Sequence, residues 1–123
     1  FAAGPYLYAI NANDGTTITS FGTDGKVDLR VGLGRDSSKL TVTATTPGVI
    51  FKDLLIQGTA LGEGYDAAPG FVRAYNLKSG KIAWTFHTIP QPGEFGYDTW
   101  SENAYKEVGG TNSSAGMSLD EAR

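Results

Sequence analysis

The sequence predicts an all-β fold of short strands, tight turns and long loops. Seventeen glycines and a charged fraction of only 19% in 123 residues suit strands joined by tight turns better than a helical bundle. Large side chains recur at every second position in two runs, first Phe71, Arg73 and Tyr75 and then Ile82, Trp84 and Phe86, which is the period of a β-strand. Together these two observations place the chain among the all-β proteins.

The segment between the two alternating runs, residues 76–80, is typical of a hairpin turn. Gly80 can adopt the positive φ that closes such a turn, and the Asn76 side chain can bond to the backbone ahead of it. We therefore expect residues 71–73 and 82–86 to pair antiparallel. We also expect Trp84 to be largely buried against a neighbouring sheet.

The turn pattern occurs twice in the chain. Four residues recur at a constant offset of 65 positions: Ala9, Asn11, Gly15 and Phe21 match Ala74, Asn76, Gly80 and Phe86. Two copies at one period favour a repeat architecture, in which each unit is a small sheet that buries its faces against its neighbours. The first copy predicts a hairpin of residues 5–11 with 16–21, although Thr19 stands where the second copy has Trp84.

The remaining elements follow from the same patterns. The sequence predicts a brief strand or a surface run at 26–31, strands at 40–44, 49–51, 54–57 and 117–119, and loops at 32–39 and 59–69. The continuous apolar run at 54–58 favours a strand buried on both faces. Residues 100–108 favour one or two helical turns with Ser101 as the cap.

Charge and composition exclude several classes of function. A net charge of −3 and an isoelectric point near 5.0 leave no basic surface for nucleic acid. The absence of cysteine excludes disulfides and thiolate metal sites, and no apolar run approaches membrane-spanning length. His87 is the single histidine, and we expect it to be a packed or rim residue.

Residues 74–84 fit the pattern A-x-N-x-x-x-G-K-x-x-W. This element resembles the tryptophan-docking repeat of the eight-bladed β-propellers that carry pyrroloquinoline quinone (PQQ). Segments covering nearly the whole chain follow in the order seen in membrane-type quinoprotein glucose dehydrogenases: LYAINANDG, FGTDGKVDL, TTPGVIFKDLLIQG, GFVRAYNLKSGKIAWTF and GGTNSSAGMSLDEAR. The resemblance implies a partial β-propeller of about one and a half blades, with long loops.

The resemblance also implies how these blades divide the chain, which we expect to be a fragment of one propeller domain. It places the end of one blade at 1–31, the next blade at 40–88, and a loop with the start of a further blade at 89–123. Open strand edges in fewer than two blades predict self-association through strand pairing.

The function implied by the resemblance is oxidation of an aldose, such as glucose, to its lactone. PQQ would be the cofactor, with Ca²⁺ or Mg²⁺ beside it, and a quinone-type acceptor would take the electrons. A periplasmic location is implied, with any inner-membrane anchor outside this chain. In the family the substrate-activating residues lie in later blades, so we expect no catalytic residue and no activity from these 123 residues alone.

Four residues match site positions of the resembled family. Glu63 matches a metal ligand, Thr45 a hydroxyl against a quinone carboxylate, and Thr111 and Asn112 the segment under the cofactor ring. Each also has a purely structural interpretation, as a loop carboxylate, a strand-start threonine and a turn. Asp66 is a poorer metal candidate.

One departure from the family's pattern bears on the cofactor. Ser113-Ser114 stand where relatives carry a tryptophan under the quinone. That departure favours a second interpretation, a non-enzymatic propeller module acting as a scaffold or as a partner-binding surface.

Overall fold

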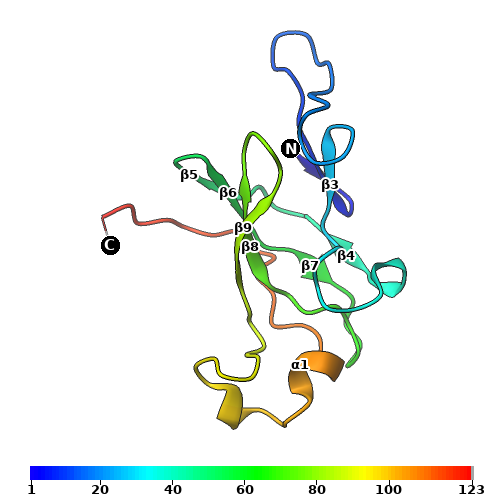
Figure 1. The fold of residues 1–123 in the computed structure, drawn as a ribbon, viewed down its shortest axis with the longest axis vertical. Coiled ribbons are helices and arrows are strands. Elements are labelled where there is room, and N and C mark those ends of the chain that lie inside the picture. The colour runs from blue at the N-terminus through cyan, green and yellow to red at the C-terminus, as the bar shows by residue number, and fades with distance from the viewer. Residues whose placement is uncertain (123) are drawn as a thin grey trace.

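The computed structural model describes residues 1–122, whose strands form three antiparallel sheets (Figure 1). The first sheet has the order β1-β2-β3, the second pairs β4 with β7, and the third has the order β5-β6-β8-β9. The strands are β1 (Ala2–Ala3), β2 (Tyr6–Tyr8), β3 (Lys26–Asp28), β4 (Val42–Thr43), β5 (Val49–Phe51), β6 (Leu54–Gln57), β7 (Ala60–Leu61), β8 (Val72–Asn76) and β9 (Ile82–Phe86). Helical structure is limited to two 3₁₀ turns, η1 (Ser37–Lys39) and η2 (Tyr97–Thr99), and to α1 (Ala104–Glu107) within the described residues.

The four-stranded sheet confirms the hairpin predicted for residues 71–86, and the strands predicted at 49–51 and 54–57 pair as another hairpin. In the hairpin of residues 49–57 Phe51 pairs with Leu54, and Lys52 takes a φ of 55° in the two-residue turn between them. In the hairpin of residues 71–86, Val72 pairs with Phe86 and Ala74 with Trp84, with a bulge before Tyr75. The all-β prediction is therefore confirmed, and the sheet is consistent with one propeller blade.

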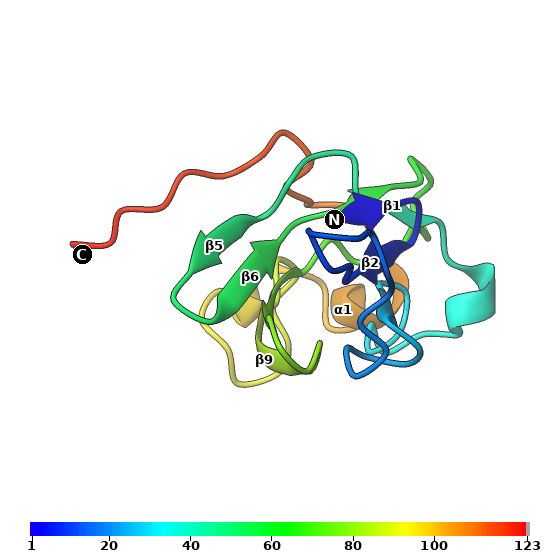
Figure 2. The same cartoon turned by 90° about the horizontal axis from the view of Figure 1, so that it is seen from above.

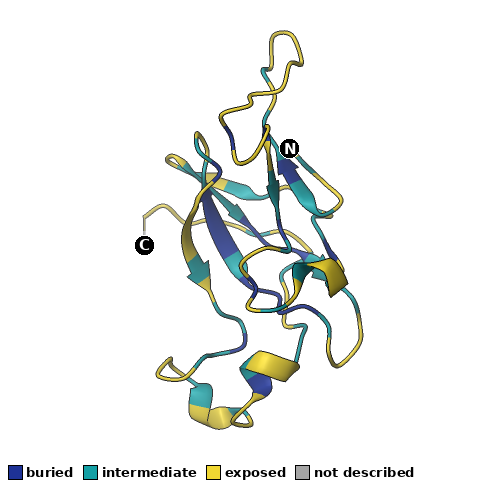
Figure 3. Ribbon diagram, turned by 45° about the vertical axis from the view of Figure 1, so that its right-hand side comes forward, coloured by how far each residue is buried: buried dark blue, intermediate teal, exposed yellow. Residues whose placement is uncertain are grey.

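Strand β8 is the most buried strand of the sheet (Figure 3). Arg73, Ala74 and Tyr75 are 2%, 0% and 1% exposed. Residues Leu54, Leu55 and Ile56 of β6 are only half-buried, so the prediction that β6 is buried on both faces is wrong. The core gathers at β8 instead, where Tyr75 joins the cluster that includes Leu7 and Leu29 of the first repeat.

The predicted first hairpin is only partly correct. Its turn forms, but residues 16–21 pair with residues 5–11 through a single bridge between Ile10 and Thr17. Strand β2 pairs with β1 on one edge and with β3 on the other, so neither edge remains for a longer returning strand. The chain bends after the bridge and carries Phe21 into the core, where its side chain is 5% exposed.

The prediction that Trp84 is largely buried is wrong, because its side chain is 42% exposed. It lies on β9, the edge strand of the four-stranded sheet, together with Ile82 at 43% and Phe86 at 62% exposure. Trp84 and Phe86 pair with Ala74 and Val72 and therefore share one face of the sheet, whereas the bulge places Ile82, which pairs with Tyr75, on the opposite face.

The long connections hold less regular structure than the strands. The predicted loop at 59–69 contains β7, which pairs with β4, and α1 begins after Asn103 rather than after a Ser101 side-chain cap. Residues 117–119 form no strand, so that prediction is wrong, and the C-terminal segment extends away from the sheets (Figure 2). Among residues 1–122 no helix is long and apolar enough to cross a bilayer.

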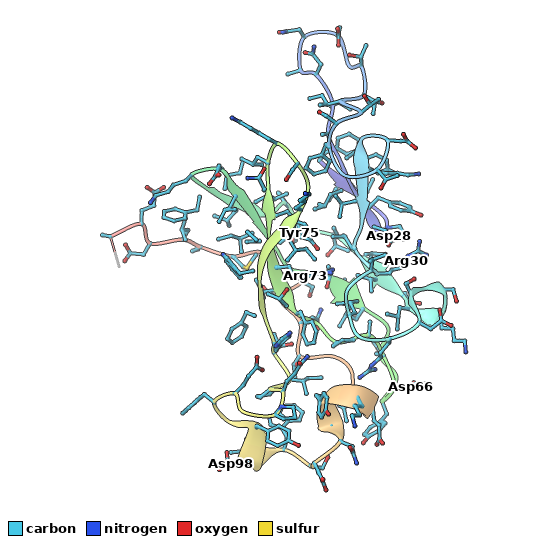
Figure 4. The ribbon with its side chains drawn as sticks, viewed as in Figure 1. Asp28, Arg30, Asp66, Arg73, Tyr75 and Asp98 are labelled. Atoms are coloured by element: carbon cyan, nitrogen blue, oxygen red, sulfur yellow. The ribbon has the colours of Figure 1, made fainter. Side chains whose placement is uncertain are left out.

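Arg73 joins the two repeats from inside the core (Figure 4). Its guanidinium donates to the carbonyl oxygens of Leu29 and of Val31, the second at 2.7 Å. Burial lowers the pKa of Arg73, because its charged form loses water. A buried arginine with these two acceptors fixes the first repeat against β8.

Candidate functional site

A cavity of about 400 Å³ lies between the end of β7 with the loop after it and the segment 109–114. Glu63, Asn112 and Ser114 contribute polar side chains to its lining, and four glycines contribute backbone: Gly62, Gly64, Gly109 and Gly110. A lining of exposed backbone amides and a few polar side chains suits carbonyl and carboxylate groups of a ligand.

Hydrogen bonds hold the segment 109–114 in place along this cavity. Gly70 donates its backbone N–H to the Gly110 carbonyl at 2.9 Å, and Gly110 donates to the Ala68 carbonyl at 3.0 Å. The Asn112 side-chain amide donates to the Thr59 carbonyl at 2.8 Å. The segment is thus tied to the chain on both sides of the cavity.

Two glycines allow this segment to approach the sheet closely. A Cβ at Gly58 would lie 2.1 Å from the Ser113 carbonyl oxygen, and one at Gly70 would lie 2.5 Å from the Asn112 Cβ. Neither position can carry a larger side chain without displacing the segment. Neither glycine could be identified as part of the site from the sequence, because only the long-range path of residues 109–114 reveals what they face.

The structure brings together two of the four residues that the resemblance assigns to the site. Glu63 and Asn112 line the same cavity. Thr45 instead lines another cavity, of about 480 Å³, and its hydroxyl is 3.4 Å from the Ser114 carbonyl. Thr111 also lies outside the Glu63 cavity, and its hydroxyl donates to the Thr88 hydroxyl at 3.1 Å.

The carboxylates near the cavity do not converge. Asp66 lines an adjacent cavity of about 190 Å³ rather than the one that holds Glu63. Residues 1–122 contain no group of three or more histidines, cysteines or acidic residues that could hold a metal ion. Since Ca²⁺ takes six to eight oxygen ligands, Glu63 could supply one ligand of a metal site but could not form the site alone.

His87 lies apart from this cavity and is a packed residue, as predicted. Its ring meets Phe71 edge-on at 4.5 Å, and its Nδ1 is 2.7 Å from a Glu94 carboxylate oxygen. The pKa of Glu94 is lowered, chiefly by the Gln91 backbone N–H and next by the hydrogen bond with His87. The histidine therefore closes the loop after β9.

The chemistry of the lining fits part of a planar quinone cofactor. Asn112 and Ser114 can bond to carbonyl or carboxylate oxygens, and Glu63 can bind a hard cation beside them. None of the residues that line the cavity is aromatic. These residues therefore suit the polar rim of such a cofactor and provide no stacking surface for its ring.

Comparison with known proteins identifies the class of protein to which this arrangement belongs. Residues 1–123 match the family model described as "PQQ: Glucose/ethanol/alcohol dehydrogenase, beta-propeller domain". The chain belongs to this family of PQQ-dependent dehydrogenases, and its sheets are part of a β-propeller.

Several curated relatives share this family. Quinate/shikimate dehydrogenase (quinone) of Acinetobacter baylyi is 31% identical over 116 residues, which are 93% of this chain and 14% of the relative. The glycerol dehydrogenase large subunit of Gluconobacter oxydans is 31% identical over 94% of this chain and 15% of its own length. Quinoprotein glucose dehydrogenase of the same organism is 29% identical over 76% of this chain and 12% of its own length. The chain thus spans a small part of these relatives, and no solved structure gives a significant match.

Proposed function

We propose that this chain forms part of the cofactor cradle of a PQQ-dependent dehydrogenase that oxidises a sugar or polyol. The observation that carries the proposal is the meeting of Glu63 and Asn112 in one cavity, from segments almost 50 positions apart in the sequence. The family match supports the cofactor, and the names of the relatives support a hydroxylated substrate. The finer proposal is an aldose, such as glucose, oxidised to its lactone.

In this proposal the chain's own residues bind and orient. Glu63 contributes one oxygen ligand to Ca²⁺ or Mg²⁺, and Asn112 and Ser114 bond to oxygens at the rim of the quinone. Thr45 bonds to the Ser114 carbonyl of the segment 109–114, and Thr111 joins that segment to Thr88. PQQ, when bound, supplies the two-electron chemistry, which no residue of this chain performs.

The test is calorimetric titration of the complete protein with PQQ and Ca²⁺. Glu63→Gln keeps the shape of the side chain but removes its charge, so we expect roughly tenfold weaker Ca²⁺ affinity. Glu107→Gln, on the exposed side of α1, is the matched control and should leave the affinity unchanged. Equal Ca²⁺ affinity in Glu63→Gln and the parent protein would exclude Glu63 as a ligand.

Dye-linked oxidation assays separate the possible substrates. Glucose should be oxidised faster than glycerol or quinate if the aldose proposal is correct. A preference for glycerol or quinate would agree with the proposal of a PQQ-dependent dehydrogenase but would refute the proposal of an aldose substrate.

A non-enzymatic module is the second candidate, and the cavity's lack of an aromatic lining residue favours it. The two candidates differ in one measurement, PQQ binding to the complete protein. A dissociation constant in the micromolar range or tighter supports the dehydrogenase. No PQQ binding in the presence of Ca²⁺ supports the scaffold.

The remaining proposals concern the protein's surroundings. A periplasmic location and a quinone-type electron acceptor are supported by the resemblance to membrane-type enzymes. Self-association of the 123-residue chain is supported by the exposed apolar side chains of edge strand β9: Ile82, Trp84 and Phe86. Analytical ultracentrifugation tests it, since Trp84→Lys should shift the chain to monomer.

A further inference from the structure

A further cavity, of about 570 Å³, lies between the first sheet and the turn that joins β8 to β9. Tyr6 and residues of β3 form one wall, and residues 79–82 form the other. The cavity shares no lining residue with the one that holds Glu63 and Asn112. We call it the inter-repeat groove, because it lies between the first sheet, which contains part of the first copy of the repeat, and the turn of the second copy.

The walls of this groove are fixed by direct backbone contact. Gly22 donates its N–H to the Ser79 carbonyl at 2.9 Å. A Cβ at Gly80 would lie 2.7 Å from a Val27 methyl carbon and 2.9 Å from the Gly22 nitrogen, so the walls meet as closely as glycine permits. A groove held in this way is preformed, and a ligand would lose little affinity to ordering it.

The groove carries positive charge in a chain whose net charge is −3. Lys26 and Lys81 line it, and neither has an ion-pair partner among residues 1–122. Asp28 is the single acidic lining residue. Its carboxylate is 2.7 Å from the Arg30 guanidinium, and the hydrogen bond from Arg30 lowers the pKa of Asp28. Since Arg30 neutralises this carboxylate, the two lysines dominate the field and favour an anion.

The other parts of the lining are apolar. Val31 is 56% exposed and Ile82 is 43% exposed, and both face this groove. The Tyr6 ring lies 5.0 Å from the Lys26 ammonium, and the Tyr6 hydroxyl accepts a hydrogen bond from Arg30 at 3.0 Å. A ligand that satisfied both parts of the lining would join an anionic group to an apolar body.

We propose that the inter-repeat groove is a second binding site, which takes a small carboxylate with an apolar body. The carboxylate lies between the Lys26 and Lys81 ammonium groups. The apolar body covers Val31 and Ile82. This site is independent of the proposed PQQ cradle, because it uses other residues.

Benzoate is the probe for the test, titrated into the complete protein at low salt. PQQ and Ca²⁺ are present in saturating amounts, so that the Glu63 cavity does not compete for the probe. We expect saturable binding with a dissociation constant in the millimolar range or tighter, weakening as the salt concentration rises. Absence of saturation at roughly 10 mM benzoate would overturn the proposal.

The chain offers matched controls for the two lysines. Lys26→Gln with Lys81→Gln should weaken benzoate binding about tenfold or more. Lys52 and Lys106 also lie over aromatic rings, those of Phe51 and Tyr105, at 5.0 and 5.3 Å. Their exchange for Gln should change the affinity less than about twofold. An equal loss in both pairs would refute the site.

Two further probes separate the parts of the lining. Benzyl alcohol keeps the apolar body without the charge and should bind at least about tenfold more weakly than benzoate. Inorganic phosphate carries charge without an apolar body, and equal affinity for phosphate would indicate an adventitious ion only.

Ile82→Ser, on the exposed edge strand, should weaken benzoate binding while leaving PQQ binding unchanged. An unchanged benzoate affinity in Ile82→Ser would refute the apolar part of the site.

Discussion

The two copies of the repeat have the same turn but not the same strands. Asn11 donates its N–H to Thr16 and accepts from Gly15, both at 2.8 Å. Asn76 makes the same two bonds with Lys81 and Gly80, also at 2.8 Å. Gly15 and Gly80 have φ values of 73° and 70°. The first pair after each turn is also equivalent, Ile10 with Thr17 and Tyr75 with Ile82.

Beyond this pair the copies diverge. The second copy goes on pairing until Phe86, which is 62% exposed, whereas the first bends so that Phe21 is 5% exposed. The reason lies in the strand before the turn. Both edges of β2 are occupied by β1 and β3, while β8 has β6 on one edge and leaves the other for β9. Local sequence therefore determines the turn, and neighbouring strands determine whether a hairpin extends beyond it.

The largest effect expected from this comparison is at Arg73, which aligns with Tyr8 in the first copy. Arg73→Ala removes the donors to the Leu29 and Val31 carbonyls and leaves a cavity beside Tyr75. We expect the free energy of unfolding to fall by about 3–5 kcal/mol. Tyr8→Ala, which removes a half-buried ring stacked on Phe1, should lower it by roughly 1–2 kcal/mol. Urea denaturation measures both, and equal losses would show that Arg73 does not join the repeats.

The two turn glycines form a closely matched pair. A Cβ at Gly15 would meet nothing within 4 Å, whereas one at Gly80 would meet Val27 and Gly22. Both alanine variants have the strain of a positive φ, about 1 kcal/mol. Gly80→Ala should lower the free energy of unfolding by about 1–2 kcal/mol more than Gly15→Ala, because the inter-repeat contact must open. The same denaturation experiment tests this, and two equal values would mean that the contact at Gly80 is loose.

Those parts of the fold that depend on nearby residues could be predicted from the sequence. The β5–β6 and β8–β9 hairpins and both asparagine turns follow from residues within a few positions of each other. The pairing of β2 with β3 and the exposure of Trp84 could not be predicted in this way. They depend on which edges and faces other segments cover.

The candidate site follows the same division. Glu63 and Asn112 were identified through the family's motif order, and the structure places both in one cavity. The close approach of Ser113 to Gly58 and the two carbonyl acceptors of Arg73 have no local sequence signal. They arise because the chain between these residues folds back on itself.

The turn asparagines should differ less than the glycines. The Asn76 side-chain oxygen accepts from the Lys78 and Ser79 backbone N–H groups, each at 3.0 Å, and from the Ser79 hydroxyl at 3.2 Å. The Asn11 oxygen accepts from the Asn13 N–H, at 2.9 Å. Asn76→Ala should therefore lower the free energy of unfolding by about 1–2 kcal/mol and Asn11→Ala by roughly half that. Amide hydrogen exchange of the two turns checks the order, and faster exchange in the Asn11 variant would reverse it.

The smallest expected effect is a pH dependence that only the first turn should have. Asp14 and Ser79 are equivalent positions, and each accepts from the backbone N–H two residues on, at 2.9 Å from Thr16 and 3.3 Å from Lys81. The pKa of Asp14 lies below the ordinary 3.8, chiefly because the Thr16 hydroxyl donates to the carboxylate and secondly because the Thr16 backbone N–H does. Because the folded pKa is the lower one, this stabilisation is present above the unfolded pKa and is lost as the pH falls through the folded value.

An NMR titration between pH 6 and 2 should show the Thr16 amide responding below about pH 4 while the Lys81 amide does not. Asp14→Ser should abolish the response and Ser79→Asp should create it at Lys81. A Thr16 response that persists in Asp14→Ser would assign the titration to another group.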